Sequence, residues 1–382
     1  MLRYAALAVI AALSLTSQQA FAYVARAPFG VLADGTKVEV VDLLNSRGVR
    51  ARIISYGAAL QTLIAPDTYG RRADVVLGYA KLDDYVANQQ RLGAIVGRYA
   101  GRIANGQFVL DGKTYALTKN DGKNTLDGGA KGFDKVVWTI DKVDETSTES
   151  SVVMHYTAKD GEEGFPGALT VTVTYTLNEN SELTIAYKAT TDKPTVVNLT
   201  NHAYFNLTGE AYGVTALTER LTLSEDKFAA LNADLLPTGD MVSVMGKSFD
   251  FRVEGTIADH LKDTTDPQMA LLHGNIGHFF AIKGADGKKP QLAARLVEPS
   301  NGRVLEVLTT EPGVEFQTGY AFDGKSVGKS GTAYKAGAGV CFLAEHPADA
   351  PNQKKFPSTR LDPGKVYAQT TVYRFTSLPA PK

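Results

Sequence analysis

The chain has 382 residues, a formal net charge of −1 and a single cysteine. Lys and Arg are spread along it without a basic cluster, which argues against nucleic acid or an anionic membrane surface as the partner. Cys341 cannot form an internal disulfide, and its apolar neighbours indicate a buried thiol rather than a nucleophile. We therefore expect a small, neutral partner.

The first 22 residues have the pattern of a secretory signal peptide. A basic Arg3 precedes an apolar stretch, and Ala20-Phe21-Ala22 forms a small-x-small cleavage site. The apolar stretch is shorter than the roughly 20 residues that span a bilayer. We expect residues 1–22 to be removed and residues 23–382 to form the mature protein, periplasmic or secreted and without a membrane anchor.

The rest of the chain has the periodicity of β-strands. Residues 168–177 alternate polar and apolar side chains and are rich in β-branched types, as half-buried strands are. Asp-Gly and Asn residues at 110–113 and 177–180 predict tight turns between strands. Helical turns are expected at 81–88 and 256–262. These features predict an all-β protein, a large antiparallel β-sandwich in a single domain.

Several motifs resemble those of one enzyme family. The segment GRYAGRIANG, from Gly97, closely resembles a signature of the aldose 1-epimerases. Other matches follow in family order: NTLDGGAKGFDKVVW from Asn124, GFPG from Gly164, PTVVNLTNHAYFNLTG from Pro194, LPTG from Leu236, SFDFR from Ser248, LTTEPGVEFQTG from Leu308 and DAPNQKKFPSTRLDPG from Asp349. The resemblance implies a galactose mutarotase-like sandwich that interconverts the α and β anomers of free aldoses.

That reaction requires a base for the anomeric hydroxyl and an acid for the ring oxygen, and neither metal nor organic cofactor. Histidines are few and lack metal-ligand spacing, so no metal site is expected. His202 matches the family's general acid, although a lone histidine between Thr200 and Tyr204 also fits an ordinary core residue. Arg102 matches the family's substrate-binding arginine, whose guanidinium can hold two sugar oxygens.

Three positions depart from the family pattern around the substrate. Asp127 stands where the family has a sugar-contacting histidine, and it fits either a sugar acceptor or a plain Asp-Gly turn. Gly277 replaces a sugar-contacting aspartate and leaves His278 as a ligand contact or a structural residue. Glu315 replaces a sugar-binding glutamine, which keeps the shape and adds a charge.

The fourth departure concerns the base. Counting without gaps places Leu343 at the position of the family's catalytic glutamate, and leucine cannot accept a proton. A compensated shift, with two residues gained before the strand and two lost after it, would instead place Glu345 at that position. Glu345 lies two residues downstream, on the same face of a strand and displaced by roughly 6.5 Å. Three alternatives stay open: Glu345 as the base, Glu315 as the base, or no competent base. We take His202 and Glu345 as the catalytic pair, with Arg102, Asp127, His278 and Glu315 contacting the sugar.

Three functions fit this sequence. The first is an exported aldose 1-epimerase that acts on neutral hexoses, as a monomer or weak dimer. The second keeps the fold but changes the chemistry, to epimerisation or isomerisation at another carbon or to a modified sugar. The third is a sugar-binding protein without catalysis. Whether the Glu345 carboxyl faces the same cleft as the His202 ring is the observation that separates them most directly.

Overall fold

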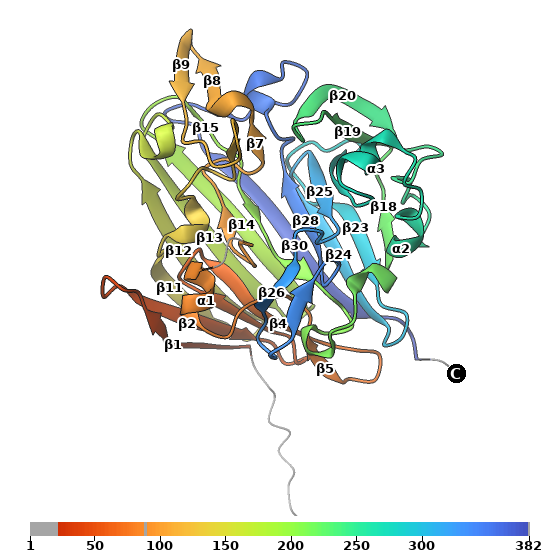
Figure 1. Ribbon diagram of the computed structural model, residues 1–382. Helices are drawn as coiled ribbons and strands as arrows, with labels where there is room; N and C mark the ends of the chain where they lie inside the picture. Colours follow the sequence, from red (N-terminus) through yellow and green to blue (C-terminus); the bar gives the residue numbers. More distant parts are fainter. Residues whose placement is uncertain (1–21, 88–89, 381–382) are drawn as a thin grey trace, which may run out of the picture.

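A computed structural model describes residues 22–87 and 90–380, and the expected signal peptide lies outside these residues except for Ala22. The described chain is rich in strands, with helices confined to short segments between them (Figure 1). The helices are α1 (Leu82–Ala87), α2 (Ile257–His260) and α3 (Pro267–Leu271). Over the described ranges no helix has the length and apolarity required to cross a bilayer.

The largest sheet has nine antiparallel strands and forms one layer of the sandwich. Its strands, in spatial order, are β11 (Thr139–Glu145), β12 (Glu149–Ala158), β13 (Leu169–Asn178), β14 (Glu182–Thr191), β30 (Tyr367–Ser377), β24 (Arg303–Thr309), β23 (Gln291–Val297), β18 (Arg220–Leu223) and β21 (Gly255–Thr256). The alternation predicted at 168–177 is confirmed, because every second residue of β13, from Leu169 to Leu177, is buried.

Two smaller sheets form the opposing layer. The five-stranded sheet, red to orange at the bottom of Figure 1, contains β1 (Tyr23–Val31), β2 (Lys37–Leu44), β3 (Arg50–Ile54), β4 (Ala59–Pro66) and β5 (Arg72–Asp74). The six-stranded sheet contains, in spatial order, β17 (Tyr204–Phe205), β28 (Val340–Glu345), β25 (Gly313–Gln317), β22 (Gly277–Ala281), β19 (Lys227–Leu231) and β20 (Pro237–Ser243).

Short two-stranded pairs complete the fold. They are β6 (Ile95–Val96) with β16 (Thr200–Asn201), β7 (Arg102–Ile103) with β10 (Thr125–Leu126), β8 (Gln107–Leu110) with β9 (Lys113–Ala116), β15 (Thr195–Val196) with β29 (Arg360–Leu361), and β26 (Asp323–Val327) with β27 (Ala333–Lys335). The predicted turn at 110–113 is confirmed, since Asp111 and Gly112 have the positive φ of a two-residue hairpin.

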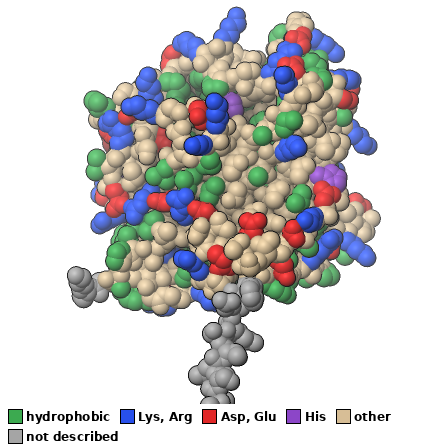
Figure 2. All heavy atoms as spheres, turned by 180° about the vertical axis from the view of Figure 1, so that it is seen from behind, with side chains coloured by type: hydrophobic (Ala, Val, Ile, Leu, Met, Phe, Trp, Pro, Cys, Tyr) green, Lys and Arg blue, Asp and Glu red, His purple; other side chains and the backbone are tan. Residues whose placement is uncertain are grey.

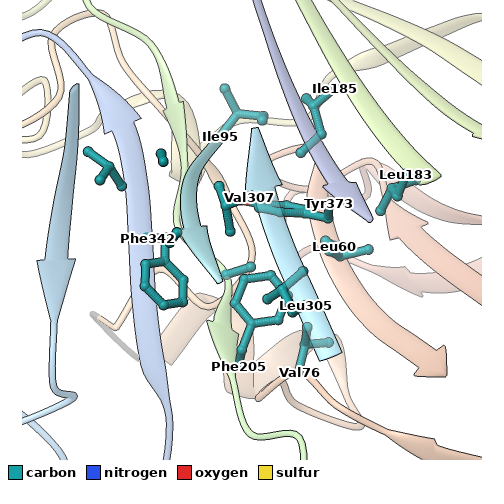
Figure 3. Close-up of a cluster of buried hydrophobic side chains, with 14 of the residues drawn as sticks. Leu60, Val76, Ile95, Leu183, Ile185, Phe205, Leu305, Val307, Phe342 and Tyr373 are labelled. Carbon is teal, nitrogen blue, oxygen red and sulfur yellow. The ribbon is translucent and has the colours of Figure 1, made fainter. Parts of the chain in front are cut away.

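The main core fills the space between the two layers. In Figure 3, Phe342 of β28 and Phe205 of β17 lie beside Tyr373 of β30 and Leu305 of β24. The Phe205 and Tyr373 rings meet edge to face at 4.9 Å between centroids. Such packing buries apolar surface worth about 25 cal/mol per Å². The sandwich is therefore one domain with a continuous core, as predicted.

Strand β28 is buried on both faces, and this decides where the candidate site forms. Phe342 points into the main core. Cys341 and Leu343 point to the opposite face and join a second apolar cluster, and the thiol is buried as predicted. Because side chains alternate along a strand, Glu345 must share the face of Leu343. The six-stranded sheet thus turns its second face, with Glu345 at one end, toward a cavity.

Candidate active site

A cavity of about 400 Å³ opens above the second face of the six-stranded sheet. Three neighbouring strands contribute alternate residues to its wall: Gly277 and Phe279 from β22, Glu315 and Gln317 from β25, and Leu343 and Glu345 from β28. Segments beside these three strands add Tyr204 from β17, Arg102 from β7, and Arg91, Asp127, His202 and Tyr320 from loops. A cavity of this size, with mixed polar and apolar walls, suits a small organic ligand.

His202 lies between β16 and β17 and is held by its backbone. Its N–H donates to the carbonyl of Ala94 at 2.9 Å, and its side chain is buried in the cavity wall. The Nδ1 atom is buried without a hydrogen-bond partner among the described residues. Burial lowers the pKa of His202 to about 4, because the opposing attraction of Asp127 is too weak to offset it. The imidazole is therefore neutral at neutral pH.

Glu345 is the last residue of β28 and is 1% exposed. The next residue is clamped by Asn198, whose Oδ1 accepts from the His346 N–H at 2.9 Å while its Nδ2 donates to the His346 carbonyl at 3.2 Å. Within the described structure, Glu345 Oε2 is buried without a hydrogen-bond partner. Burial raises the pKa of Glu345 well above its ordinary value, and the negative charges of Glu315 and Asp127 add to this effect. Glu345 therefore keeps its proton at pH values at which an exposed glutamate is ionised.

Glu315 lies directly opposite Leu343 in the pairing of β25 with β28. Its Oε1 accepts from Gln317 Nε2 at 2.7 Å, and Gln317 Oε1 in turn accepts from the Tyr204 hydroxyl at 2.9 Å. Burial raises the pKa of Glu315 to about 7, although the Gln317 hydrogen bond and the Arg102 charge both oppose the rise. Glu315 thus sits near half ionisation at neutral pH.

Asp127 is a turn residue, and its side chain also lines the cavity, where it is placed to accept from a ligand. Its φ of 51° lies in the left-handed region, and its Oδ1 accepts from the Gly101 N–H at 2.9 Å. Arg91 Nε lies 3.4 Å from its Oδ2. Burial opposes ionisation, but Arg91, His202 and the Gly101 N–H together lower the pKa of Asp127, which is therefore a carboxylate.

Arg102 is brought to Asp127 by strand pairing. Antiparallel β7 and β10 set Arg102 opposite Leu126, one residue before Asp127. Its Nε donates to Asp121 Oδ2 at 2.7 Å, which fixes the guanidinium at the cavity wall. Asp349 ties the same segment to the end of β28, because its N–H donates to the Arg102 carbonyl at 2.7 Å. Arg102 and Glu345 are thereby held in one rigid frame.

Five of the six predicted site residues line this cavity, and His278 does not. His278 is fully buried on the opposite face of β22, between the rings of Phe228 and Phe249, with centroid distances of 5.5 and 4.7 Å. Its neighbours Gly277 and Phe279 face the cavity, and strand alternation turns the intervening side chain into the core. The expected sugar contact of His278 is thus corrected to a core position.

Several cavity residues were not predicted. Arg91 has a φ of 53° in a loop after α1, and its guanidinium lies between Asp127 at 3.4 Å and Asp134 at 3.8 Å. Phe279 and Tyr320 contribute ring surface to the cavity wall.

Within residues 22–87 and 90–380, no three His, Cys, Asp or Glu side chains are grouped as metal ligands would be. Figure 2 shows basic and acidic side chains interspersed over one face of the molecule, without a large patch of either sign.

Known proteins resemble this chain over nearly its whole length. A model of the family described as aldose 1-epimerase matches residues 39–374. Galactose mutarotase of Bos taurus is 42% identical over 354 residues, which cover 92% of this chain and 98% of that protein. Aldose 1-epimerase of Escherichia coli K12 is 34% identical over 344 residues, covering 90% of this chain and 96% of that one.

Solved structures agree with the fold. The crystal structure of galactose 1-epimerase from Lactobacillus acidophilus NCFM superposes with a TM-score of 0.81 at 27% identity, covering 93% of this chain and 99% of that one. An aldose epimerase homologue from C. elegans gives 0.79 at 30% identity, covering 88% and 98%. The cavity described above thus belongs to a fold shared with these epimerase structures.

Proposed function

Since this chain belongs to the aldose 1-epimerase family, we propose that it interconverts the α and β anomers of a free aldose by opening and closing the sugar ring. One observation carries the proposal: His202 and Glu345 line the same cavity, where burial lowers the pKa of the imidazole and raises the pKa of the carboxyl group. Ring opening requires a group that accepts a proton from the anomeric hydroxyl and a group that donates one to the ring oxygen.

The electrostatics favour an assignment opposite to that expected from the sequence. Burial leaves His202 without a proton and Glu345 with one. Neutral His202 can therefore accept the proton of the anomeric hydroxyl while Glu345 donates to the ring oxygen. When the ring closes on the other face of the aldehyde, each group performs the reverse transfer. The pair carries one proton throughout, so the cycle needs no net proton exchange with solvent.

Three other residues suit the binding of sugar hydroxyls. Arg102 offers its outer guanidinium nitrogens while Asp121 holds Nε. Ionised Asp127 accepts hydroxyl protons, and Glu315 can accept or donate because its pKa of about 7 allows both forms. These groups would orient the ring so that its anomeric carbon lies between His202 and Glu345.

Polarimetry tests the proposal directly. Freshly dissolved α-glucose or α-galactose should reach its equilibrium rotation faster with the protein than in buffer, in proportion to protein concentration. A rate equal to that of buffer at high protein concentration would contradict mutarotation. NMR in deuterium oxide separates anomer exchange from chemistry at another carbon, because anomerisation exchanges no carbon-bound hydrogen.

A sugar-binding protein without turnover is the second candidate, and Leu343 is the observation that favours it. This side chain lines the cavity and cannot transfer a proton, and an ungapped count aligns it with the family's glutamate. Calorimetric binding of glucose or galactose, combined with a polarimetric rate no faster than buffer, would select this candidate.

The location and assembly of the protein are further parts of the proposal. The signal-like pattern of residues 1–22 supports export to the periplasm or the medium. Cell fractionation with N-terminal sequencing of the product tests it, and a product that keeps Met1 in the cytoplasm would contradict it. We also propose a monomer or weak dimer, to be tested by light scattering after size-exclusion chromatography.

A further inference from the structure

The carboxyl groups of the cavity outnumber the cations that pair with them. Arg91 lies 3.4 Å from Asp127, and Arg102 donates to Asp121 at 2.7 Å. No Lys or Arg of the described chain lies within the 4.0 Å of an ion pair from Glu315 or Glu345. Two buried carboxyl groups in the wall therefore have no ion-pair partner among the described residues, and the Arg102 charge that acts on Glu315 from a longer distance is shared with Asp121.

These two carboxyl groups flank one spot on the sheet. Glu315 pairs with Leu343 and Gly313 pairs with Glu345, so the two glutamates are diagonal neighbours, with Cα atoms roughly 7–8 Å apart. Glu345 Oε2 is buried, lies in a residue that is 1% exposed and accepts no hydrogen bond from the described protein. Such an oxygen can accept a hydrogen bond from a bound ligand, and that bond would be favourable because a buried acceptor left unpaired costs roughly 1–3 kcal/mol.

An aromatic ring borders the same spot. Phe279 is the cross-strand partner of Glu315. Its ring also covers Gly313, the partner of Glu345, so closely that a Cβ atom on Gly313 would overlap it. Phe279 lines the cavity. Two carboxyl groups beside a phenyl ring form the kind of surroundings that bind an organic cation, by charge, hydrogen bonds and cation–π attraction.

We propose that the cavity prefers a free aldose bearing an ammonium group, an amino sugar, over the neutral aldose, with Glu315 as the counter charge and Glu345 Oε2 as an acceptor. This inference rests on the proposed function, which places a free sugar in the cavity. His202 and Glu345 act on the anomeric hydroxyl and the ring oxygen in the proposed reaction, so an ammonium group that reaches Glu345 stands close to the anomeric carbon, and C2 is the carbon next to it. The substrate class is therefore the 2-amino-2-deoxyhexoses.

The protonation of Glu315 gives this preference a signature. Its pKa of about 7 means that the carboxyl is mostly protonated at slightly acidic pH. An ammonium ion favours the ionised form, so binding below pH 7 must release a proton from Glu315. A neutral sugar supplies no such charge and should release none.

Calorimetry on the full chain tests the inference, with glucosamine as the cationic probe and with glucose and N-acetylglucosamine as neutral probes. At about pH 7 we expect glucosamine to bind at least about tenfold more tightly than either neutral sugar. At about pH 6.5, titrations in two buffers of different ionisation enthalpy should reveal proton release for glucosamine and none for glucose. Equal affinities for glucosamine and glucose, or no binding of glucosamine, would overturn the inference.

A variant isolates the counter charge. Glu315→Gln should bring the ratio of glucosamine to glucose affinities close to one. Asp234→Asn, which removes an exposed carboxylate paired with Lys123 at 2.9 Å near the cavity mouth, should leave the ratio high. A ratio that survives in Glu315→Gln would overturn the inference, and if that variant fails to fold, proton release by the wild-type chain decides. Tight glucosamine binding without anomer exchange would contradict mutarotation but support the amino-sugar site.

Discussion

Glu315 and Glu345 lie on the same face of the six-stranded sheet as diagonal neighbours, and Leu343 separates them by standing opposite Glu315. The residue that an ungapped count aligns with the family's catalytic glutamate is thus apolar, and the carboxyl groups of Glu315 and Glu345 lie beside it. Side chains on a strand alternate between its two faces. Glu345 therefore faces the cavity like Leu343, two residues before it, whereas a glutamate only one residue from Leu343 would face the core.

The first prediction is that Glu345→Gln lowers kcat for anomer exchange by roughly 10²- to 10⁴-fold, the usual contribution of a general acid–base group. The amide keeps the shape of the side chain but cannot donate and recover a proton. Polarimetry measures kcat and KM, and KM should change far less than kcat. Exposed Glu149 provides a matched control, because Glu149→Gln should retain full activity. Retention of more than a tenth of kcat by Glu345→Gln would remove Glu345 from the mechanism.

The second prediction concerns the acid limb of the pH profile. Activity needs neutral His202, and burial places its pKa at about 4 instead of the ordinary 6.5. As pH rises through about 4, His202 loses its proton and kcat/KM should increase tenfold per unit before levelling off. Circular dichroism at each pH verifies that the chain stays folded. A limb centred near pH 6.5 would show that His202 titrates like an exposed histidine.

The third prediction identifies Glu311 as a positioning residue behind Glu345. Glu311 is 1% exposed, and its carboxylate accepts from His346 Nδ1 at 2.7 Å and from the Tyr367 hydroxyl at 2.9 Å. Its charge contributes to the raised pKa of Glu345, after burial, Glu315 and Asp127. Glu311→Gln should therefore lower the pKa of Glu345 and move the alkaline limb of kcat/KM to lower pH.

A matched variant separates charge from packing in that experiment. Tyr367→Phe removes one hydrogen bond to Glu311 but leaves its charge, so the alkaline limb should stay in place. If Glu311→Gln and Tyr367→Phe shift the alkaline limb equally, Glu311 acts only through packing, and the prediction that its charge raises the pKa of Glu345 is wrong.

Local sequence signals predicted the fold well. The alternation at 168–177 became β13, the Asp111-Gly112 turn joins β8 to β9, and the helical patterns at 81–88 and 256–262 contain α1 and α2. Each of these elements can be recognised from residues adjacent in the sequence, by the periodicity of their side chains or by residue types that favour positive φ. Helix α3 was not predicted, although Asp266 and Pro267 form an N-cap and first helical position that the sequence displays.

The site was harder to predict because it depends on faces and long-range pairing. His278 could have been excluded from sequence, since its neighbour at position 277 was already aligned with a sugar-contacting residue and adjacent strand residues point to opposite faces. Arg91 carried no such signal. Its meeting with Asp127 follows from the packing of two loops 36 positions apart, and only the structure brings them together. The proton states of His202 and Glu345 likewise follow from burial, which residue type does not reveal.

The fourth prediction concerns stability at a carboxyl group away from the cavity wall. Glu225, between β18 and β19, is 1% exposed, and neither of its carboxyl oxygens has a hydrogen-bond partner among the described residues. Burial raises its pKa to about 8 from 4.5. Between these two values the folded chain keeps a proton that the unfolded chain has lost, so the free energy of unfolding must fall as pH rises.

Glu225→Gln removes this titration and should stabilise the protein at alkaline pH. Below about pH 4.5 both side chains are neutral and similar in shape, so the Tm values should coincide. By pH 8 the wild-type chain should be less stable than the variant by roughly 4 kcal/mol, because a proton held about 3.5 pH units longer in the folded state contributes about 1.4 kcal/mol per unit until the folded pKa is reached. This corresponds to a Tm difference of several degrees. Calorimetric melting at both pH values measures the difference, with Glu149→Gln as the exposed control. Because the sign depends only on which state holds the proton, a variant less stable than wild type at pH 8 would mean that Glu225 is ionised and paired in the folded protein.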